Sequence, residues 1–362
     1  MARIHGIALV GVGDVAQRDY LPEFGRLRDR AAIVVACGRS ARVSEVARQF
    51  DVPSWTRSYA DAVSRPDVDV VVNLTPFPLH EPITLAALEA GKHVYSEKPL
   101  AQSVRGAESI RKLAAERGLV VAAAPSVMVF PQVLRVATIL ESRELGPITS
   151  VRGQGFGGVP PWEGYLSDPS PFFVAETGPL VDMAVYPLHA ITGLLGPVRE
   201  VTALASRTRN SFEIEAGPFA DTAVPVECDD DWHLVLRLAS GPLVSIEANM
   251  CVAGTLSPEV EIRGEQGVVA FDLLDGAKPV RVLAGGDVRE ELVADERGGG
   301  PDHLLGIAHL LDCLEGSAEP RLTVDHALHV IAVIEAARTS VRERRVVHVD
   351  APAMVDQGVA DG

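Results

Sequence analysis

The sequence predicts an α/β protein of two domains, in which a doubly wound parallel sheet precedes an α+β domain with a large, open, mostly antiparallel sheet. Three observations support this fold class. Apolar runs alternate with helical segments early in the chain, a glycine-rich GVGDVA stretch follows the first run, and a period of two takes over after about residue 125. We expect domains over residues 1–124 and 125–350, and a flexible tail over 351–362.

The N-terminal strands are expected where apolar and β-branched residues run together. These runs occupy residues 4–10, 31–37, 69–74, 93–99 and 119–125. Helical spacing separates them at residues 41–50, 81–91 and 103–118, the last ending at Gly118. Strands that are apolar on both faces and alternate with helices are typical of a parallel sheet.

The C-terminal domain is expected to contain strands with one covered face. Period-two segments occupy residues 148–156, 200–207, 232–238 and 243–250, and residues 259–272 are typical of a hairpin that turns near Gly264 to Gly267. Helical patterns fall at residues 131–144, 180–195, 303–316 and 325–343. The mixture predicts an α+β domain.

Composition excludes several classes of protein. The formal net charge of the 362 residues is −16, whereas nucleic acids and anionic membranes bind basic surfaces. No apolar run reaches the roughly 18–20 residues of a membrane span. The start, MARIHGIALVGVG, is typical of a strand rather than a signal peptide. We expect a cytoplasmic protein that binds neither nucleic acid nor membrane.

No metal site is expected. The four cysteines form no CxxC pair and lack zinc-ligand spacing, which favours buried thiols in a reducing cytoplasm. The acidic run ECDDD at residues 227–231 lacks the regular spacing of a calcium loop, so a solvated turn is expected there.

The GVGDVA stretch predicts a dinucleotide site. Gly11, Gly13 and Ala16 stand in G-x-G-x-x-A register between a strand and a helix, with Asp14 and Val15 at the start of that helix. The first glycine permits a tight turn, the second lets a pyrophosphate approach the backbone, and the small third residue allows close helix packing. Amides at the helix N-terminus then face the phosphates. The alternative is a purely structural tight turn.

The end of the second strand bears on the choice of cofactor. NAD sites usually place an acidic residue here, but this chain has Gly38, Arg39 and Ser40 after Cys37. Arg39 can pair with a ribose 2′-phosphate and Ser40 can donate a hydrogen bond to it. We therefore expect NADP, the alternative being NAD with Arg39 covering the adenine.

Lys98 stands between Glu97 and Pro99 at the end of an apolar strand. Strand ends in such a sheet border the cofactor crevice, so Lys98 is expected to point toward the nicotinamide and Glu97 to hold the cofactor or the lysine. A desolvated lysine near positive charge has a lowered pKa and can exchange protons near neutrality. The alternative is a surface salt bridge in a loop.

Four stretches in this order resemble one family. They are GVGDVA, NLTPFPLH (73–80), AGKHVYSEKPL (90–100) and DMAVYPLH (182–189). Together they are similar to the glucose–fructose oxidoreductase, inositol dehydrogenase and MocA-like (Gfo/Idh/MocA) family. The resemblance implies an N-terminal Rossmann domain that carries NAD(P). It also implies a C-terminal domain whose sheet lines the substrate pocket and joins subunits into a homodimer or homotetramer.

The resemblance also implies residue roles. Lys98 matches the catalytic lysine, Asp182 the aspartate of the D-x-x-x-[H/Y] motif, and Tyr186 its His-or-Tyr acid/base. His80 matches a residue near the nicotinamide, beside the loop of Leu74, Thr75 and Pro76. A phenol has a pKa of about 10, so a cation such as Lys98 would have to lower it for proton transfer. The alternative for Tyr186 is a buried tyrosine with a satisfied hydroxyl.

The chain departs from the family pattern near this motif. Ala184 stands where a glycine is usual, and only Gly178 remains of a glycine-rich lead-in. Inositol-type members carry histidine at the position of Tyr186, which favours sugar and dihydrodiol oxidoreductases over cyclitol dehydrogenases.

Further candidates for substrate contacts are Trp162, Tyr165 and His189. Trp162 and Tyr165 lie in a Gly-, Pro- and aromatic-rich segment that can close over a sugar ring, or equally form a rigid loop or subunit contact. His189 can reach a substrate hydroxyl, or equally pack within a helix.

The sequence thus predicts an NADP-dependent oxidoreductase that acts on a sugar, keto-sugar or polyol with a Lys/Tyr acid–base couple. Two alternatives remain. One is a glycoside-cleaving or epimerising enzyme that retains its nucleotide, and the other is a dinucleotide-binding protein without turnover.

Overall fold

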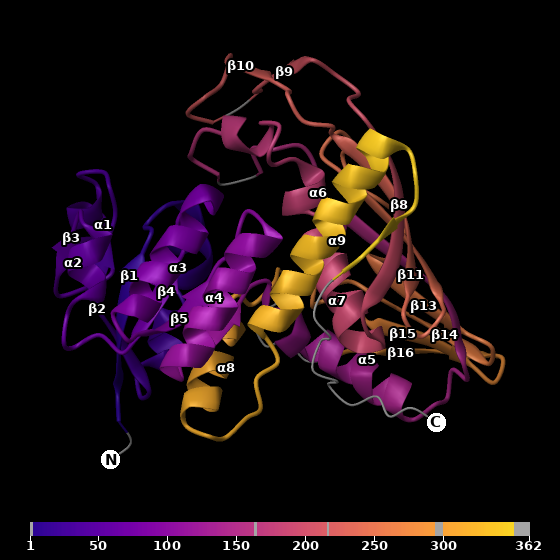
Figure 1. Ribbon diagram of the computed structural model, residues 1–362, viewed down its shortest axis with the longest axis horizontal. Helices are drawn as coiled ribbons and strands as arrows, with labels where there is room; N and C mark the ends of the chain where they lie inside the picture. The colour runs from indigo at the N-terminus through magenta and orange to yellow at the C-terminus, as the bar shows by residue number, and fades with distance from the viewer. Residues whose placement is uncertain (1–2, 163–164, 216, 294–299, 351–362) are drawn as a thin grey trace. The chain divides into compact units, whose positions relative to one another are not determined.

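The computed structural model describes residues 3–162, 165–215, 217–293 and 300–350, shown in Figure 1. They form two compact units. The first unit runs to Val129 and includes Asp302–Ile331, and the second unit comprises Phe130–Pro301 and the chain from Ala332. The sequence had assigned residues 302–331 to the C-terminal domain, but ion pairs fix them in the first unit, Arg26 to Asp302 at 2.9 Å and Arg30 to Asp312 at 2.7 Å. The expected tail at 351–362 lies outside the described residues.

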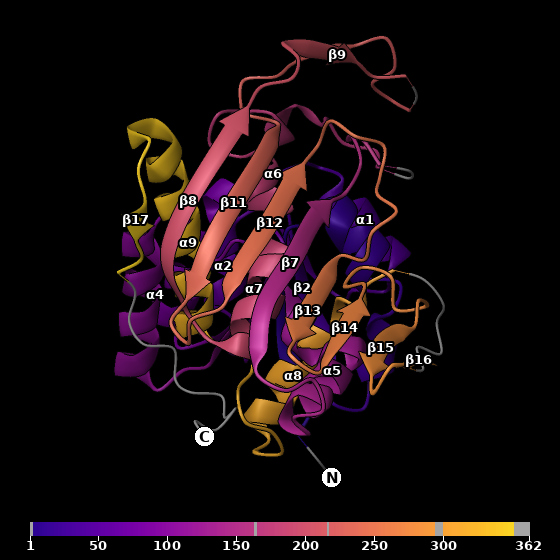
Figure 2. The same ribbon diagram turned by 90° about the vertical axis from the view of Figure 1, so that its right-hand side faces the viewer.

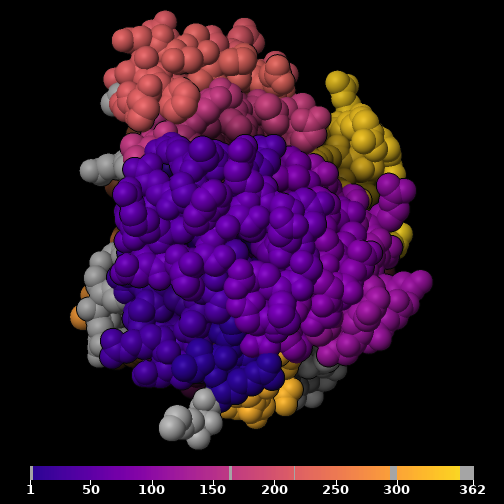
Figure 3. Space-filling view, turned by 90° about the vertical axis from the view of Figure 1, so that its left-hand side faces the viewer, coloured from indigo at the N-terminus to yellow at the C-terminus, as the bar shows by residue number. Residues whose placement is uncertain are grey.

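The first unit contains the predicted parallel sheet. Its six strands run in the order β3-β2-β1-β4-β5-β6, and every neighbouring pair is parallel. The strands are β1 (His5–Val10), β2 (Ala31–Cys37), β3 (Trp55–Thr56), β4 (Val70–Asn73), β5 (His93–Ser96) and β6 (Val121–Ala123). This is the strand order of the Rossmann fold, which confirms the predicted fold class of the N-terminal part. In Figure 3 the N-terminal residues, indigo to violet, form one continuous surface.

Helices surround this sheet. They are α1 (Val43–Gln49), α2 (Tyr59–Val63), α3 (His80–Glu89), α4 (Val104–Arg117) and α8 (Leu304–Leu314), and α9 (Val324–Glu343) begins in this unit. Gly118 ends α4 with φ of +62°, as its expected C′ role requires. After the glycine-rich turn, η1 (Ala16–Tyr20) is a π-helical turn rather than the longer α-helix that the motif predicts. Three short 3₁₀ turns complete the unit, η2 (Phe24–Leu27), η3 (Phe77–Leu79) and η4 (Ser126–Val129).

A row of backbone hydrogen bonds crosses the carboxyl ends of the parallel strands. In each bond the first residue after one strand donates to the last residue of its neighbour. The bonds are Gly11 N to Cys37 O at 2.9 Å, Leu74 N to Val10 O at 2.7 Å, Glu97 N to Asn73 O at 2.9 Å and Ala124 N to Ser96 O at 2.9 Å. The loops that follow these strands therefore start level with one another, along one edge of the sheet.

The second unit contains the predicted large sheet, which is antiparallel except for the parallel pair β12 and β7. Its nine strands run in the order β16-β15-β14-β13-β7-β12-β11-β8-β17. Their bounds are β7 (Ile148–Phe156), β8 (Val198–Ser206), β11 (Asp231–Leu238), β12 (Leu243–Asn249), β13 (Val260–Gly264), β14 (Gly267–Phe271), β15 (Val280–Ala284), β16 (Asp287–Glu291) and β17 (Val347–His348). Strands β15, β16 and β17 were not expected from the sequence. Burial alternates along β11 and β12, and Figure 2 shows one face of these strands without a helix across it.

The expected single helix over residues 180–195 is wrong, because the structure has two helices there. They are α6 (Pro179–Asp182) and α7 (Val185–Leu195), with α5 (Pro131–Glu141) and the 3₁₀ turn η5 (Ser170–Phe172) elsewhere in the unit. Both Met183 N and Ala184 N donate to Pro179 O at 2.9 Å, which tightens the chain and ends α6. Apolar residues predominate on both sides of this interruption, and Pro187 in the first turn of α7 is the one signal that a new helix begins there.

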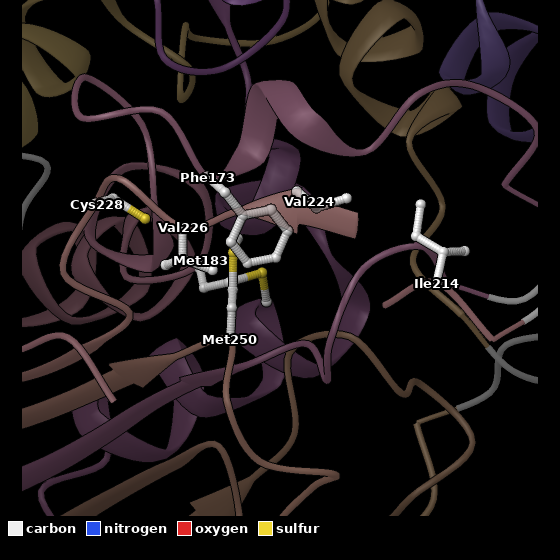
Figure 4. Packing of buried hydrophobic residues seen from close by; sticks show 7 residues of the cluster. All are labelled: Phe173, Met183, Ile214, Val224, Val226, Cys228 and Met250. Carbon is white, nitrogen blue, oxygen red and sulfur yellow. The ribbon is translucent and has the colours of Figure 1, made fainter. Parts of the chain in front are cut away.

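One apolar cluster ties an unexpected hairpin to this helix break. The hairpin pairs β9 (Ser211–Glu213) with β10 (Ala223–Pro225). Figure 4 shows the cluster, in which the Phe173 ring lies beside the sulfur-bearing side chains of Met183 and Met250. Its remaining buried members are Ile214, Val224, Val226 and Cys228. The hairpin and the residue next to Asp182 therefore share one core.

The stability of the second unit should depend on the protonation of Glu259. Its Oε2 accepts hydrogen bonds from Leu273 N at 2.6 Å and Leu274 N at 2.9 Å, and burial raises the pKa of this carboxyl from 4.5 to about 7. Between these two values the folded protein holds a proton that the unfolded chain has released. The free energy of unfolding should therefore fall as the pH rises from about 4.5 to 7, with a contribution of about 3 kcal/mol from this group.

Urea denaturation at pH 5 and pH 7.5 measures this effect. Glu259→Gln should reduce the difference between the two pH values, because glutamine keeps an acceptor oxygen and does not titrate. Glu265→Gln, at an exposed position of the turn between β13 and β14, is the matched control and should leave the pH dependence as in the parent. An unaltered pH dependence in Glu259→Gln would contradict the assignment.

Candidate active site

The glycine-rich turn has the shape that a dinucleotide phosphate requires. Gly11 has φ of +100°, and a Cβ there would lie 2.4 Å from the Leu74 carbonyl oxygen. Gly13 is exposed, and a Cβ added to it would meet nothing within 4 Å. The first glycine therefore lets the turn pass close to the next strand, and the second leaves open space over the backbone. This division of roles fits the pyrophosphate of NAD(P).

The residues after this turn are held by local contacts. Gln17 Nε2 donates to Val12 O at 2.8 Å, which fixes the turn from inside the protein. Ala16 is completely buried, as the small residue of the motif should be. Asp14 Oδ2 is buried and finds no hydrogen-bond donor among the described residues, while Val15 is half-buried beside it. Gln17 was not identified from the sequence, although its position one residue after the motif is a usable signal.

The loop after β4 is fastened by Asn73 and His80. Asn73 Nδ2 donates to His80 O at 3.0 Å, and its Oδ1 accepts from Thr75 Oγ1 at 2.7 Å. His80 Nδ1 lies 2.7 Å from Pro99 O and its Nε2 lies 2.7 Å from Thr75 O. The histidine thus ties the Thr75–Pro76 loop to the peptide that follows Lys98. The His80 ring itself is buried, and its position near the nicotinamide stays a prediction.

The protonation of His80 follows from its surroundings. Burial is the largest influence on the pKa of this imidazole and lowers it, while the carbonyl contacts and Glu97 act in the opposite direction. A neutral imidazole carries one N–H, so it donates to only one of the two carbonyl groups at a time. His80 therefore holds the loop in position through its contacts with Thr75 O and Pro99 O, and its lowered pKa favours the neutral imidazole.

Glu97 lies in a hydrogen-bonded group at the end of β5. Its Oε1 accepts from Tyr20 OH at 2.7 Å, and its Oε2 accepts from Lys98 N at 3.0 Å. The Tyr20 hydroxyl is 3.0 Å from the Tyr95 hydroxyl, which is 2.9 Å from Ser126 Oγ. The Glu97 carboxylate thereby fixes the backbone from which the Lys98 side chain extends.

Electrostatics keep Glu97 ionised although it is half-buried. Burial is the largest influence on its pKa and raises it, but His303, Tyr20 and Lys98 all act to lower it, and the net direction is down. His303 lies against Tyr20, with 5.9 Å between the ring centroids. It belongs to the segment 302–331, which therefore supplies part of the surroundings of the EKP motif.

Asp182 and Tyr186 are the accessible residues of a buried stretch in the second unit. Residues 180–192 are all described, and within them only Asp182 and Tyr186 are partly exposed. The helix break therefore still presents both side chains to solvent, although they lie on α6 and α7 rather than on one helix. Glu97, Lys98, Thr75 and His80 come together in the first unit, whereas Asp182 and Tyr186 belong to the second.

Close packing fixes the backbone beside Asp182. A Cβ at Gly155 of β7 would lie 2.6 Å from Met183 O, and one at Gly157 would lie 2.7 Å from Met183 Cε. Position 155 therefore requires glycine, because it faces the Met183 backbone, whereas at Gly157 the end of the flexible Met183 side chain could move aside. Ala184 stands where the family usually has a glycine. Its methyl group is completely buried and is accommodated by the packing, so this position does not require glycine.

The lesser substrate candidates are held within the second unit. Trp162 Nε1 donates to Gly157 O, and the Trp162 ring packs edge-on against Tyr165 and Phe172 at centroid distances of 6.0 and 5.0 Å. His189 is buried, with Nδ1 2.8 Å from Val185 O of its own helix. These contacts fit the rigid-loop and helix-packing alternatives, and the substrate roles of Trp162, Tyr165 and His189 stay predictions.

Neither a metal cluster nor a membrane-spanning helix is found in the described parts of the chain. There, no group of three or more His, Cys, Asp or Glu side chains is arranged to hold a metal ion. The helices described are also too short or too polar to cross a bilayer.

The Tyr20 hydroxyl should contribute measurably to stability through its bond to Glu97. A hydrogen bond to a buried charged group is worth about 1.5–3 kcal/mol, so Tyr20→Phe should lower the free energy of unfolding by about that amount at pH 7. Tyr59→Phe removes the hydroxyl of a tyrosine that is 43% exposed and should change it by less than about 0.5 kcal/mol. Chemical denaturation measures both, and equal stabilities for the two variants would argue against the bond.

Two family models match separate parts of the chain. Residues 5–124 match the GFO/IDH/MocA model described as the oxidoreductase family with an NAD-binding Rossmann fold. Residues 133–270 match the GFO/IDH/MocA C-terminal domain. Together these matches cover more than half of the sequence.

Curated relatives align over part of their length. Levoglucosan dehydrogenase of Pseudarthrobacter phenanthrenivorans is 27% identical over 256 residues, 66% of this chain and 64% of that protein. A dTDP-3,4-didehydro-2,6-dideoxy-alpha-D-glucose 3-reductase of Streptomyces violaceoruber is 30% identical over 194 residues, 52% of this chain and 54% of that protein. The alignments thus span less than two thirds of the length of either relative.

Solved structures share the fold over nearly the whole chain. Levoglucosan dehydrogenase in complex with NADH has a TM-score of 0.83 at 20% identity and covers 97% of this chain and 100% of that one. At this identity the likeness establishes the fold alone. The two family models, in contrast, match both the dinucleotide turn and the region of Asp182 and Tyr186. This chain therefore belongs to the Gfo/Idh/MocA family.

Proposed function

We propose that this chain is an NADP-dependent oxidoreductase that transfers hydride between nicotinamide and a sugar, keto-sugar or related polyol. One observation carries the proposal. The backbone at Gly13 is open, and Glu97 holds the turn at Lys98. Both segments follow ends of parallel strands, and backbone hydrogen bonds keep these ends level along one edge of the sheet. In open α/β sheets this edge is where ligands bind.

The cofactor would be held by residues of the first unit. Gly11, Gly13 and the helical turn from Asp14 to Ala16 are assigned to the pyrophosphate, and Gly38, Arg39 and Ser40 to the adenosine ribose. The loop of Leu74, Thr75 and Pro76, with His80 behind it and Glu97 and Lys98 beside it, is assigned to the nicotinamide end. The absence of an acidic residue directly after Cys37 supports NADP, although the levoglucosan dehydrogenase structure contains NADH.

The substrate class is inferred from the relatives. Levoglucosan dehydrogenase and the dTDP-sugar 3-reductase are both named for reactions of sugars. Because the alignments cover only part of these proteins, the extension of their substrates to this chain is a proposal. The same proposal assigns substrate contacts to Trp162, Tyr165 and His189.

The proposed mechanism divides the work among three side chains. Bound nicotinamide supplies the hydride acceptor or donor. When an alcohol is oxidised, its carbon loses hydride and its hydroxyl proton must go to a base. We assign that base to Tyr186, with the Lys98 ammonium lowering the pKa of the phenol and stabilising the alkoxide. Asp182 orients the lysine, the tyrosine or a substrate hydroxyl.

Two further assignments belong to the proposal. The uncovered face of the large sheet exposes Leu204, Val235 and Leu243, which are 78%, 47% and 44% exposed. We assign this face to a second copy of the chain, in a homodimer or homotetramer whose size light scattering measures. The four free thiols support a cytoplasmic location.

Loss of either member of the Lys/Tyr couple should remove turnover and leave nucleotide binding intact. Lys98→Ala and Tyr186→Phe should each lower kcat/KM by at least about 100-fold, since general acid–base groups contribute about 10²–10⁴-fold. Absorbance at 340 nm with a panel of sugars and keto-sugars measures turnover, and nucleotide titration measures binding.

Lys112→Ala and Tyr59→Phe, at exposed positions of the first unit, serve as controls that should behave as the parent. Normal turnover in Lys98→Ala or Tyr186→Phe would reject the assigned roles. Conversion of substrate without net change at 340 nm would identify the enzyme that retains its nucleotide.

The cofactor preference should depend on Arg39. Arg39→Ala should weaken binding of NADPH by about tenfold or more and that of NADH by less than about twofold, because only NADPH carries the 2′-phosphate. Fluorescence titration with both nucleotides measures the ratio. Equal losses for the two nucleotides would mean that Arg39 covers the adenine, as the alternative interpretation holds.

A further inference from the structure

Strands β2 and β3 bring three arginines to one corner of the first unit. The strands pair in parallel with Cys37 opposite Thr56, and Gly38 N donates to Thr56 O at 3.2 Å. Arg39 is the second residue after β2, and Arg57 is the first residue after β3. Arg42 is the N-cap residue of α1, the helix that follows β2. We call Arg39, Arg42 and Arg57 the arginine cluster.

One hydrogen bond fastens the two loops of this corner together. Arg57 Nε donates to Arg39 O at 2.9 Å. The bond uses one of the five N–H groups of the Arg57 guanidinium, and the other four, on its two terminal nitrogens, remain for a ligand. Ser40 Oγ accepts from Arg42 N at 3.0 Å, so the Ser40 hydroxyl hydrogen can be donated elsewhere. Backbone contacts thus shape the corner while leaving donors for an anion.

The charges of the arginine cluster are not balanced by the protein. All three arginines are exposed, and no carboxylate of the described residues forms an ion pair with any of them. Elsewhere in the same unit arginines are paired, as Arg65 is with Asp67 at 2.6 Å. The three arginines therefore gather positive charge on neighbouring loops of a chain whose formal net charge is −16. An anion bound at this corner would be attracted to that charge.

Asp61 is one acid close to this corner. Its charge contributes to the raised pKa of Cys37, after burial as the main cause, so it lies within electrostatic reach of the end of β2. Its backbone amide donates to Ser58 Oγ at 3.2 Å at the start of α2. Glu45 in the first turn of α1 is another such acid, so the three arginines outnumber these two carboxylates.

The position of the arginine cluster relates it to the glycine-rich turn. Gly11 N donates to Cys37 O at 2.9 Å, so the turn and the end of β2 are on adjacent strands. Adjacent strands lie about 4.8 Å apart. In this fold the pyrophosphate binds at the glycine-rich turn, and a residue about 20 positions further on recognises the ribose. A phosphate monoester on that ribose would reach the corner that Arg57 and Arg39 form.

We propose that Arg57 and Arg42 complete, with Arg39 and Ser40, a site for the ribose 2′-phosphate, so that Arg57 is a specificity-determining residue for NADP. The inference rests on the proposed function, because it assumes a dinucleotide on the glycine-rich turn. Arg57 acts in two ways. Its terminal nitrogens bind the phosphate, and its Nε holds the peptide of Arg39 so that both guanidinium groups face the same anion.

Binding of 2′,5′-ADP and 5′-AMP to the full-length protein, measured by calorimetry, tests the inference without turnover. The two probes differ only by the 2′-phosphate. The parent should bind 2′,5′-ADP more tightly by at least about tenfold. Arg57→Gln and Arg42→Gln should each weaken 2′,5′-ADP by about tenfold and change 5′-AMP by less than about twofold. Arg57→Lys should give an intermediate loss, since it keeps the charge without the planar fork.

The matched control is Arg48→Gln, an exposed arginine in the last turn of α1, which should bind both probes as the parent does. Equal binding of the two probes by the parent would refute 2′-phosphate recognition and with it the NADP assignment. A parent that prefers 2′,5′-ADP, with Arg57→Gln and Arg42→Gln unchanged or equally weakened for both probes, would overturn only the roles of Arg57 and Arg42. Thermal denaturation of each variant confirms that it is folded.

Discussion

The candidate site depends on a row of backbone hydrogen bonds across the ends of the parallel strands. In each bond the amide of the residue after one strand donates to the carbonyl of the last residue of a neighbouring strand. These bonds join Gly11 to Cys37, Leu74 to Val10 and Glu97 to Asn73. A slip of one residue in any pair would turn the following loop to the other face of the sheet. Because the strands end level, the glycine-rich turn, the Thr75 loop and the EKP motif begin at one edge, and their separate chemistries can act on one extended ligand.

Local pattern was sufficient for most of the fold, because strands buried on both faces and strands buried on one face differ in period. The pattern failed where a specific contact, rather than the spacing of apolar residues, decides the structure. The stretch 180–195 is mostly apolar, yet two amides converge on Pro179 O and divide it into α6 and α7. Residues 302–331 have ordinary helical spacing, and only their ion pairs to Arg26 and Arg30 reveal that they complete the first unit.

The same distinction separates the site residues that sequence could identify from those that it could not. Gly11, Gly13 and Lys98 stand in short motifs whose spacing carries their role. Tyr20 and His303 surround Glu97 from positions far away in the chain, and Arg57 meets Arg39 only because β3 pairs with β2. Asn73 is an intermediate case, since a polar residue at the end of a run of valines is a visible signal. Sequence therefore identified the groups assigned to ligands more readily than the groups that hold them in place.

The return of the chain to the first unit at Asp302 has a consequence for biosynthesis. His303 and the acidic partners of Arg26 and Arg30 leave the ribosome only after Phe130–Pro301, roughly 170 residues, has been made. At about 5–20 residues per second, this interval lasts roughly ten to thirty seconds. During it the nascent N-terminal half lacks α8, which packs against β5 and β6 in the finished protein. The first unit therefore completes its packing only after the chain between Phe130 and Pro301 has been synthesised.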